Sequence, residues 1–200
     1  AQYKYIKDNV CQKRFLKNTD RSNSLWMTPI EGSKALFVTE DPLDAIAHSQ
    51  LFPGARYAYL CTGGTSTKAQ REMIHSFSQK FKLPIILGND NDLAGQLENF
   101  KLAYHTANIE YAINSKTQRV LLTVNGAERE WGKDEIVAAL QAVMKQRPNM
   151  ILSIPWAKDW NDDLRSSKKS ISLRIAENMV RAQIETTKSE QRGMIAGKLP

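Results

Sequence analysis

The sequence predicts an α/β domain in which a central parallel sheet of about four strands is flanked by helices. Short apolar runs without polar alternation are typical of strands buried on both faces, and such runs alternate here with helix-forming segments. Strands and helices that alternate at short spacing form parallel sheets with right-handed crossovers. The 200 residues, of which 42% are hydrophobic and 24% charged, have the composition of a globular protein, which excludes collagen-like, disordered and membrane classes.

The N-terminal part of the chain predicts a ribbon followed by the first strand and helix of the sheet domain. Residues 1–34 are polar and basic, and we expect a β-ribbon there. The run 35–39 predicts the first buried strand. It stops at Asp41, which can cap a helix, and Pro42, which suits a first turn, so a helix is expected from Pro42 to about residue 51.

The next segments repeat the alternation of strand and helix. Residues 57–61 predict a second strand and residues 62–66 a glycine-containing loop, which leads into a helix over 68–81. Residues 83–88 predict the third strand. Apolar residues at helical spacing over 93–104 then predict a third helix.

Residues 107–149 interrupt this alternation as an insertion. A strand pattern over 119–124 followed by Asn125 and Gly126 predicts a hairpin. A helix capped at Asp134 is expected to follow and to end before the proline that precedes the next apolar run.

The last two predicted elements complete the chain. Residues 150–155 predict the fourth buried strand, and residues 170–188 a helical tail. We therefore expect three parts: a basic N-terminal segment 1–34, a sheet domain 35–164 that contains the insertion, and a basic helical tail 165–200.

Charge is distributed unevenly along the chain. The net charge is +7, with a pI near 9.4. Residues 1–34 carry seven Lys and Arg against three Asp and Glu, and residues 165–200 carry eight against three, whereas residues 35–164 carry 13 against 15. The two basic flanks either contact the phosphates of a nucleic acid or are solvated surfaces, and the sequence leaves both readings open.

The two cysteines and the first residues bear on the setting of the protein. Cys11 and Cys61 lie far apart and fit neither a disulfide framework nor a zinc site, which predicts a cytoplasmic protein. Ala1 in place of an initiator Met indicates a piece of a longer protein with further domains. With no signal-like apolar segment and no run approaching 18 apolar residues, we expect no membrane partner.

Acidic residues follow three of the four predicted strands. The loops after parallel strands converge at the carboxyl edge of the sheet, where ligands bind. Carboxylates gathered there repel one another, and a divalent cation relieves the repulsion. Hard oxygen ligands suit Mg²⁺ or Mn²⁺ bound together with substrate phosphates. The acids concerned are Glu40 and Asp44, then Asp90 and Asp92, then Asp159, Asp162 and Asp163.

A local role as helix cap is the alternative for each of these acids. We expect such a role for Asp41 and Asp134, and it remains open for Asp92. Side-chain alternation along an extended segment would send Asp90 and Asp92 to one side, which favours a shared site.

Together these residues resemble the Toprim domain, which bacterial primases, type IA and type II topoisomerases and certain nucleases share. The resemblance is carried by Glu40 with Asp44 four residues later, by the pattern Asp90-x-Asp92-x-x-Gly95, and by the acidic cluster after the last strand. It covers residues 35–106 and 150–164 and implies a Toprim-like Rossmannoid fold. Residues 38–45 and 158–164 are similar in particular to Toprim-like domains of plasmid and conjugative-element proteins, where they accompany primase or relaxase functions.

The resemblance also implies roles for individual residues. Glu40 matches the glutamate that does general acid/base work, Asp90 and Asp92 match the aspartates that hold Mg²⁺, and Gly95 is the structural glycine of the motif. By the same matching, Asp44 and one of Asp159, Asp162 or Asp163 would complete the metal cluster.

Several residues near these acids are candidates for contact with a nucleic acid. Gly63 and Gly64 lie in a loop that resembles the glycine-containing loop beside the site, whose backbone N–H groups would approach phosphate; a plain tight turn is the alternative. Lys68, Arg71 and Lys158 are expected to hold the nucleic-acid backbone. A base would stack on Trp156 or Trp160, or these rings pack against the sheet.

The function expected from this pattern is Mg²⁺-dependent phosphoryl transfer on DNA or RNA. The chain would be the primase-like Toprim module of a larger mobile-element protein of DNA replication or transfer, with NTPs as further substrates. It would then be a metal-dependent nucleotidyltransferase. Two alternatives remain open: a Toprim nuclease, and a non-catalytic nucleic-acid-binding accessory module of a relaxase or replication protein.

Overall fold

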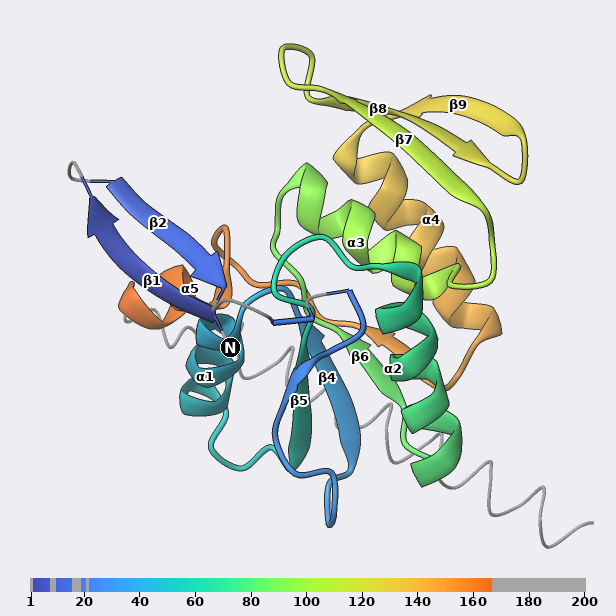
Figure 1. The fold of residues 1–200 in the computed structure, drawn as a ribbon. Coiled ribbons are helices and arrows are strands. Elements are labelled where there is room, and N and C mark those ends of the chain that lie inside the picture. The colour runs from blue at the N-terminus through green and yellow to red at the C-terminus, as the bar shows by residue number, and fades with distance from the viewer. Residues whose placement is uncertain (1, 8–9, 16–18, 21, 167–200) are drawn as a thin grey trace, which may run out of the picture.

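A five-stranded sheet forms the centre of the computed structural model, which describes residues 2–7, 10–15, 19–20 and 22–166 (Figure 1). The α/β class and the central, mostly parallel sheet flanked by helices are therefore confirmed. The tail helix predicted over 170–188 lies outside the described residues. In spatial order the strands are β10 (Met150–Leu152), β6 (Ile85–Leu87), β4 (Ala35–Thr39), β5 (Tyr57–Cys61) and β3 (Trp26–Met27).

Four of these strands are parallel, as the sequence predicts, and the fifth is not. β3 pairs antiparallel with β5, with Trp26 opposite Cys61, and closes one edge of the sheet. The strands predicted over 83–88 and 150–155 are shorter than expected. β6 begins only after Pro84, whose nitrogen carries no hydrogen to donate. β10 ends at Leu152, although the N–H of Ser153 still donates to Leu87 O at 2.9 Å.

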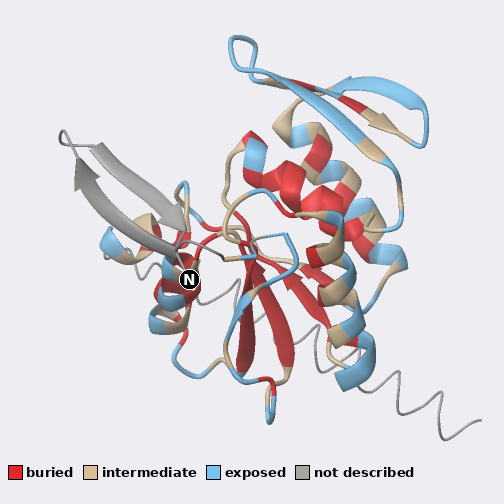
Figure 2. Cartoon of the chain, in the orientation of Figure 1, coloured by how far each residue is buried: buried red, intermediate tan, exposed pale blue. Residues whose placement is uncertain are grey.

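Helices cover both faces of the sheet, and the core accordingly has two parts (Figures 1 and 2). Alternate residues of β4 point to opposite faces: Phe37 packs with Trp160, whereas Val38 packs with Leu97. This burial on both faces explains why β4 has no polar alternation. The helices are α1 (Pro42–Leu51) and α5 (Trp160–Arg165) on one face, and α2 (Lys68–Phe81), α3 (Leu93–Ala103) and α4 (Lys133–Gln146) on the other.

The insertion forms its own antiparallel sheet of β7 (Ile109–Asn114), β8 (Arg119–Val124) and β9 (Ala127–Trp131). Asn125 and Gly126 have positive φ angles of 50° and 86°, which confirms the predicted hairpin turn. Val120 and Leu122 are buried in the same cluster as Leu140 of α4, so the insertion extends the core of the sheet domain.

The helix caps agree with the sequence at α1 and differ at α4. Asp41 caps α1 by accepting a hydrogen bond from the N–H of Leu43 at 2.9 Å, and Pro42 occupies the first turn. The predicted cap Asp134 is wrong, because Gly132 is the N-cap of α4 and Asp134 lies in the first turn. A carboxylate there still interacts favourably with the helix dipole.

The N-terminal segment contains the expected β-ribbon. β1 (Gln2–Lys7) and β2 (Val10–Phe15) pair antiparallel. In the described part of the chain, no helix is long and apolar enough to cross a membrane.

Candidate functional site: an acidic pocket at the carboxyl edge of the sheet

Glu40 follows the last residue of β4 and is held in place by the loop after the neighbouring strand. The N–H of Gly63 donates to Glu40 O at 2.8 Å, and the N–H of Thr62 donates to Thr39 O at 3.2 Å. Gly63 and Gly64 have φ angles of +74° and +128°, a backbone region that favours glycine. The glycine loop therefore turns the chain and fixes the backbone of Glu40.

Asp90 and Asp92 lie beyond the end of β6 and line the same pocket. Asn91 between them accepts a hydrogen bond from Lys133 Nζ at 3.2 Å, outside that pocket. Asp92 is also the N-cap of α3, with its Oδ1 accepting from the N–H of Gly95 at 2.9 Å. The cap role that the sequence left open is therefore combined with a position at the pocket.

Gly95 is required by a close approach of two backbone segments. A Cβ atom at this position would lie 2.3 Å from the carbonyl oxygen of Asp90 and 2.7 Å from its nitrogen. No side chain can occupy that space without moving the backbone. Gly95 thus lets α3 begin directly against Asp90.

The segment after β10 closes the other side of the pocket. The N–H of Asn91 donates to Lys158 O at 2.7 Å, and Lys158 Nζ lies 3.9 Å from Asp92 Oδ2. Asp159 lines the pocket and caps α5 by accepting from the N–H of Asp162 at 2.7 Å. Asp162 is not among the lining residues.

Asp163 holds the loop before α5 and does not line the pocket. Its side chain is buried and accepts hydrogen bonds from the N–H groups of Trp156 at 2.8 Å and Ala157 at 2.6 Å. Trp160 is also buried and donates from Nε1 to Gly88 O at 2.7 Å, whereas the Trp156 side chain is 67% exposed. Of the two tryptophans, Trp160 packs against the sheet.

These residues enclose a pocket of about 330 Å³, which we call the acidic pocket. It brings together carboxylates from three chain segments that are far apart in the sequence. Four of its residues, Asp41, Leu43, Ala94 and Asn161, were not predicted as site residues: Asp41 was interpreted only as a helix cap, and Asn161 was given no role within the segment 158–164. The pocket is lined by Glu40, Asp41, Leu43, Asp44, Asp90, Asp92, Ala94, Lys158, Asp159 and Asn161.

Crowding of negative charge shows most clearly at Asp90. Burial, together with the nearby carboxylates of Asp44, Glu40, Asp92 and Asp159, raises the pKa of Asp90 from 3.8 to about 7. Each of these four acids was a candidate from the sequence, and all of them act on the same group. A bound cation would relieve this repulsion.

The oxygen donors of the acidic pocket fit a hard divalent cation. Among the described residues, no three His, Cys, Asp or Glu side chains are arranged as a ready-made metal site. Mg²⁺ keeps several waters and uses one or two carboxylates together with substrate phosphates, so it does not require such a cage. Asp90 and Asp92, with Asp44 and Asp159 nearby, supply carboxylates of this kind.

The other predicted phosphate contacts lie outside the lining of the acidic pocket. The exposed Lys68 begins α2 and forms an ion pair with Glu72 at 3.8 Å. Arg71 donates from Nη1 to Ser66 O at 2.9 Å and so supports the glycine loop. The N–H of Gly63 is used by Glu40 O, as described above.

A buried ion pair that the sequence did not mark also supports this loop. Glu98 Oε2 accepts from the N–H of Ser66 at 2.9 Å and from its hydroxyl at 2.6 Å. Glu98 Oε1 accepts from Lys101 Nζ at 2.6 Å, with both side chains under 10% exposed. The pair ties the loop to α3.

Residues 37–120 match a protein-family model described as Toprim-like. The match includes Glu40, Asp44, Asp90, Asp92 and the glycine loop, and it ends before β10. No curated protein and no solved structure matches the chain. A Toprim-like domain is a metal-binding module that processes nucleic acids.

Proposed function

We propose, from the premise that residues 37–120 form a Toprim-like domain, that this chain catalyses Mg²⁺-dependent phosphoryl transfer on DNA or RNA. It would be the primase-like module of a larger mobile-element protein of DNA replication or transfer, in the cytoplasm. The observation that carries the proposal is the acidic pocket, in which carboxylates after β4, β6 and β10 meet.

In this proposal Asp90 and Asp92 hold the ion, and Asp44 and Asp159 complete its surroundings. When bound, Mg²⁺ or Mn²⁺ neutralises charge that develops on a phosphoryl group. Glu40 lines the same pocket and would move a proton to or from the attacking or departing oxygen.

The basic groups would position the nucleic-acid backbone. Lys158 reaches the pocket, and Lys68 is exposed at the start of α2, so both are available to phosphates. Gly63 and Arg71 act through the loop, because their observed hydrogen bonds are made to Glu40 and Ser66. The basic flanks at 1–34 and 165–200 would add attraction that depends on salt.

Metal binding tests the site directly. Calorimetric titration with Mn²⁺ and Mg²⁺ should show binding to the wild type and not to the Asp90→Asn/Asp92→Asn variant. Asn at position 92 can still cap α3, so the helix start is preserved. Asp134→Asn, an exposed change on α4, is the control and should bind as the wild type does. Equal binding by the double variant would show that the metal does not bind in the acidic pocket.

The reaction is tested by incubation with single-stranded DNA, NTPs and Mg²⁺. Primer synthesis that Glu40→Gln abolishes is the expected result. Cleavage without synthesis would instead assign a Toprim nuclease, which shares this site. A third candidate, a non-catalytic accessory module of a relaxase or replication protein, would keep the acids of the pocket without turnover. Binding of DNA without either product would support that role.

A further inference from the structure

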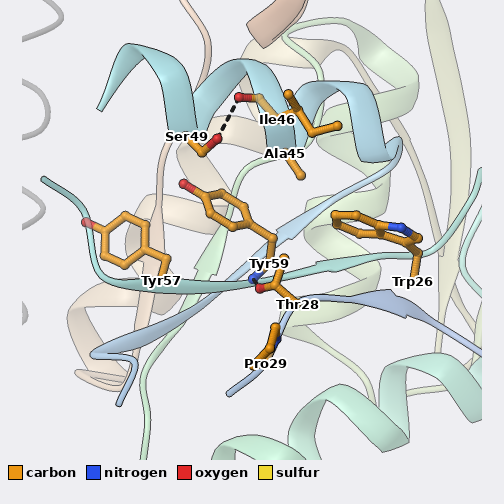
Figure 3. A pocket seen from close by; sticks show the side chains of 8 residues that line it. All are labelled: Trp26, Thr28, Pro29, Ala45, Ile46, Ser49, Tyr57 and Tyr59. Atoms are coloured by element: carbon orange, nitrogen blue, oxygen red, sulfur yellow. Dashed lines mark hydrogen bonds between the residues drawn. The ribbon is translucent and has the colours of Figure 1, made fainter. Parts of the chain in front are cut away.

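A second pocket, of about 290 Å³, lies between α1, β5 and the edge strand β3. We call it the aromatic pocket. Figure 3 shows the ring of Tyr59 pointing from β5 toward α1, with Trp26 and Tyr57 on either side of it. Ile46 and Ser49 of α1 form the opposite wall.

The aromatic pocket is open to solvent, although its walls are held in place. Trp26 and Ile46 are 42% and 43% exposed, so the indole ring is accessible to a ligand. The Tyr59 hydroxyl shares a hydrogen bond of 2.9 Å with Nδ1 of the buried His48, which fixes the phenol ring. The N–H of Tyr59 donates to the Thr28 hydroxyl oxygen at 2.9 Å, and the N–H of Thr28 donates to Tyr59 O at 3.0 Å, which fixes the segment after β3 beside Tyr59. The pocket is therefore formed before any ligand arrives.

The aromatic pocket and the acidic pocket are lined by successive residues of α1. Asp44 lines the acidic pocket, and the next residues of the helix, Ala45 and Ile46, line the aromatic one. Trp26 pairs with Cys61 at the carboxyl end of β5, next to the loop that holds Glu40. Trp26 therefore lies at the same edge of the sheet as the acidic pocket.

We propose that the aromatic pocket binds one unpaired base of a single-stranded nucleic acid whose backbone lies at the acidic pocket. Every base has a flat face that stacks on an aromatic ring, and a paired base inside a duplex cannot enter a pocket of this kind. Residues 1–34, the segment that contains Trp26, carry seven Lys and Arg against three Asp and Glu, and this net positive charge would attract the phosphates of the same strand. The inference rests on the proposed function and adds to it a binding site for one base of the single-stranded substrate.

The test measures binding rather than activity, in Mg²⁺ and without NTPs, because without the metal the carboxylates of the acidic pocket would repel the phosphates of the strand. Fluorescence anisotropy would report the affinity for a labelled oligothymidylate and for the same oligonucleotide with abasic positions. Trp26→Ala should weaken binding of the normal oligonucleotide by about 10- to 100-fold. Trp26→Ala should leave binding of the abasic oligonucleotide nearly unchanged, because that oligonucleotide has no base to stack on the Trp26 ring.

Two further variants keep the test decisive. Trp26→Phe retains an aromatic face and should restore most of the affinity, which separates stacking from a loss of folding. Phe81→Ala removes an aromatic side chain that is likewise 42% exposed, at the end of α2, and should bind as the wild type does.

Each other outcome overturns one proposal and can be told apart. If Trp26→Ala binds the normal oligonucleotide as tightly as the wild type, the base site is refuted while the proposed function stands. If the wild type binds neither oligonucleotide, the nucleic-acid function itself fails. If Trp26→Ala weakens the abasic oligonucleotide equally, the effect is not stacking.

Discussion

The charge on Asp90 provides the sharpest test of the acidic pocket. Asp90→Asn keeps the shape of the side chain and removes its charge. Burial and the neighbouring carboxylates raise the pKa of Asp90 to about 7, so the ionised carboxylate is disfavoured in the folded protein. Above pH 7 Asp90 is ionised in both the folded and the unfolded protein, but only in the folded protein is this charge unfavourable.

The size of the effect follows from the shift. A change from 3.8 to about 7 corresponds to ~4 kcal/mol for a carboxyl group that solvent does not reach. Solvent enters the pocket and screens the repulsion, so we expect metal-free Asp90→Asn protein to be about 1–2 kcal/mol more stable than the wild type at pH 8. The gain should shrink as the pH falls from 7 toward 3.8, because Asp90 in the folded wild type then takes up a proton and becomes neutral.

Urea unfolding in EDTA at pH 8 and pH 5 measures this gain. Adding Mg²⁺ or Mn²⁺ at pH 8 should stabilise the wild type, because the ion binds the folded state, and should have little effect on the variant. Asp134→Asn is the control and should change stability by less than ~0.5 kcal/mol under all conditions. A loss of stability in Asp90→Asn at pH 8, or an equal gain at both pH values, would refute the reasoning.

Three further predictions concern the buried polar groups and the motif glycine. Burial lowers the pKa of His48 to about 3, so the unfolded protein takes up a proton at this group at a higher pH than the folded protein does. As the pH falls below 6.5, this group therefore lowers the free energy of unfolding by about 1.4 kcal/mol per pH unit. His48→Phe should remove this contribution to the pH dependence of stability, measured by urea unfolding between pH 4 and 6. Glu98→Gln leaves the buried charge of Lys101 without its carboxylate and should cost ~3–5 kcal/mol in urea unfolding. Gly95→Ala places a methyl group against the backbone of Asp90 and should cost ~1–3 kcal/mol and weaken metal binding in calorimetry.

Matched variants provide controls for these predictions. Gly132→Ala, where a Cβ would meet no atom closer than 3.4 Å, should cost less than ~1 kcal/mol, the difference between glycine and alanine as an N-cap. A larger loss there than in Gly95→Ala would contradict the close-approach argument. Glu98→Gln/Lys101→Met removes both charges and should be more stable than Glu98→Gln alone; if it is not, the pair does not act through charge. Identical acid slopes in His48→Phe and the wild type would contradict the burial argument for His48.

The sequence predicts those parts of the fold and site that depend on strand ends. The buried runs of β4 and β6 are unbroken by polar residues, and Glu40 and Asp90 come directly after them, so their meeting at one edge follows from parallel topology alone. The turn at Asn125 and Gly126 was predictable for a similar reason, because few residues other than Asn and Gly adopt positive φ.

Other parts depend on contacts between residues distant in the sequence. β7 was not predicted, and β9 was implied only as the second strand of the hairpin, because nearly all of their residues are exposed and leave no apolar alternation. α5 has six residues, too few for a helical period, so Asp159, Asp162 and Asp163 were interpreted as one acidic cluster that would supply a metal ligand, and no helix was predicted. The structure separates them: Asp159 lines the pocket, and Asp163 accepts hydrogen bonds from the loop before the helix.

The position of β10 has a consequence for the order in which the molecule folds. Glu40, Asp90 and Asp92 are synthesised well before Met150–Leu152, and the whole insertion lies between them. Because proteins are made from the N-terminus, the carboxylates emerge while β6 still lacks the strand that covers its edge. An uncovered strand edge is an aggregation hazard, and the long separation slows its pairing. A chain that stops within the insertion would keep most of the acids and lose Lys158 and Asp159, and we expect it to accumulate as insoluble protein.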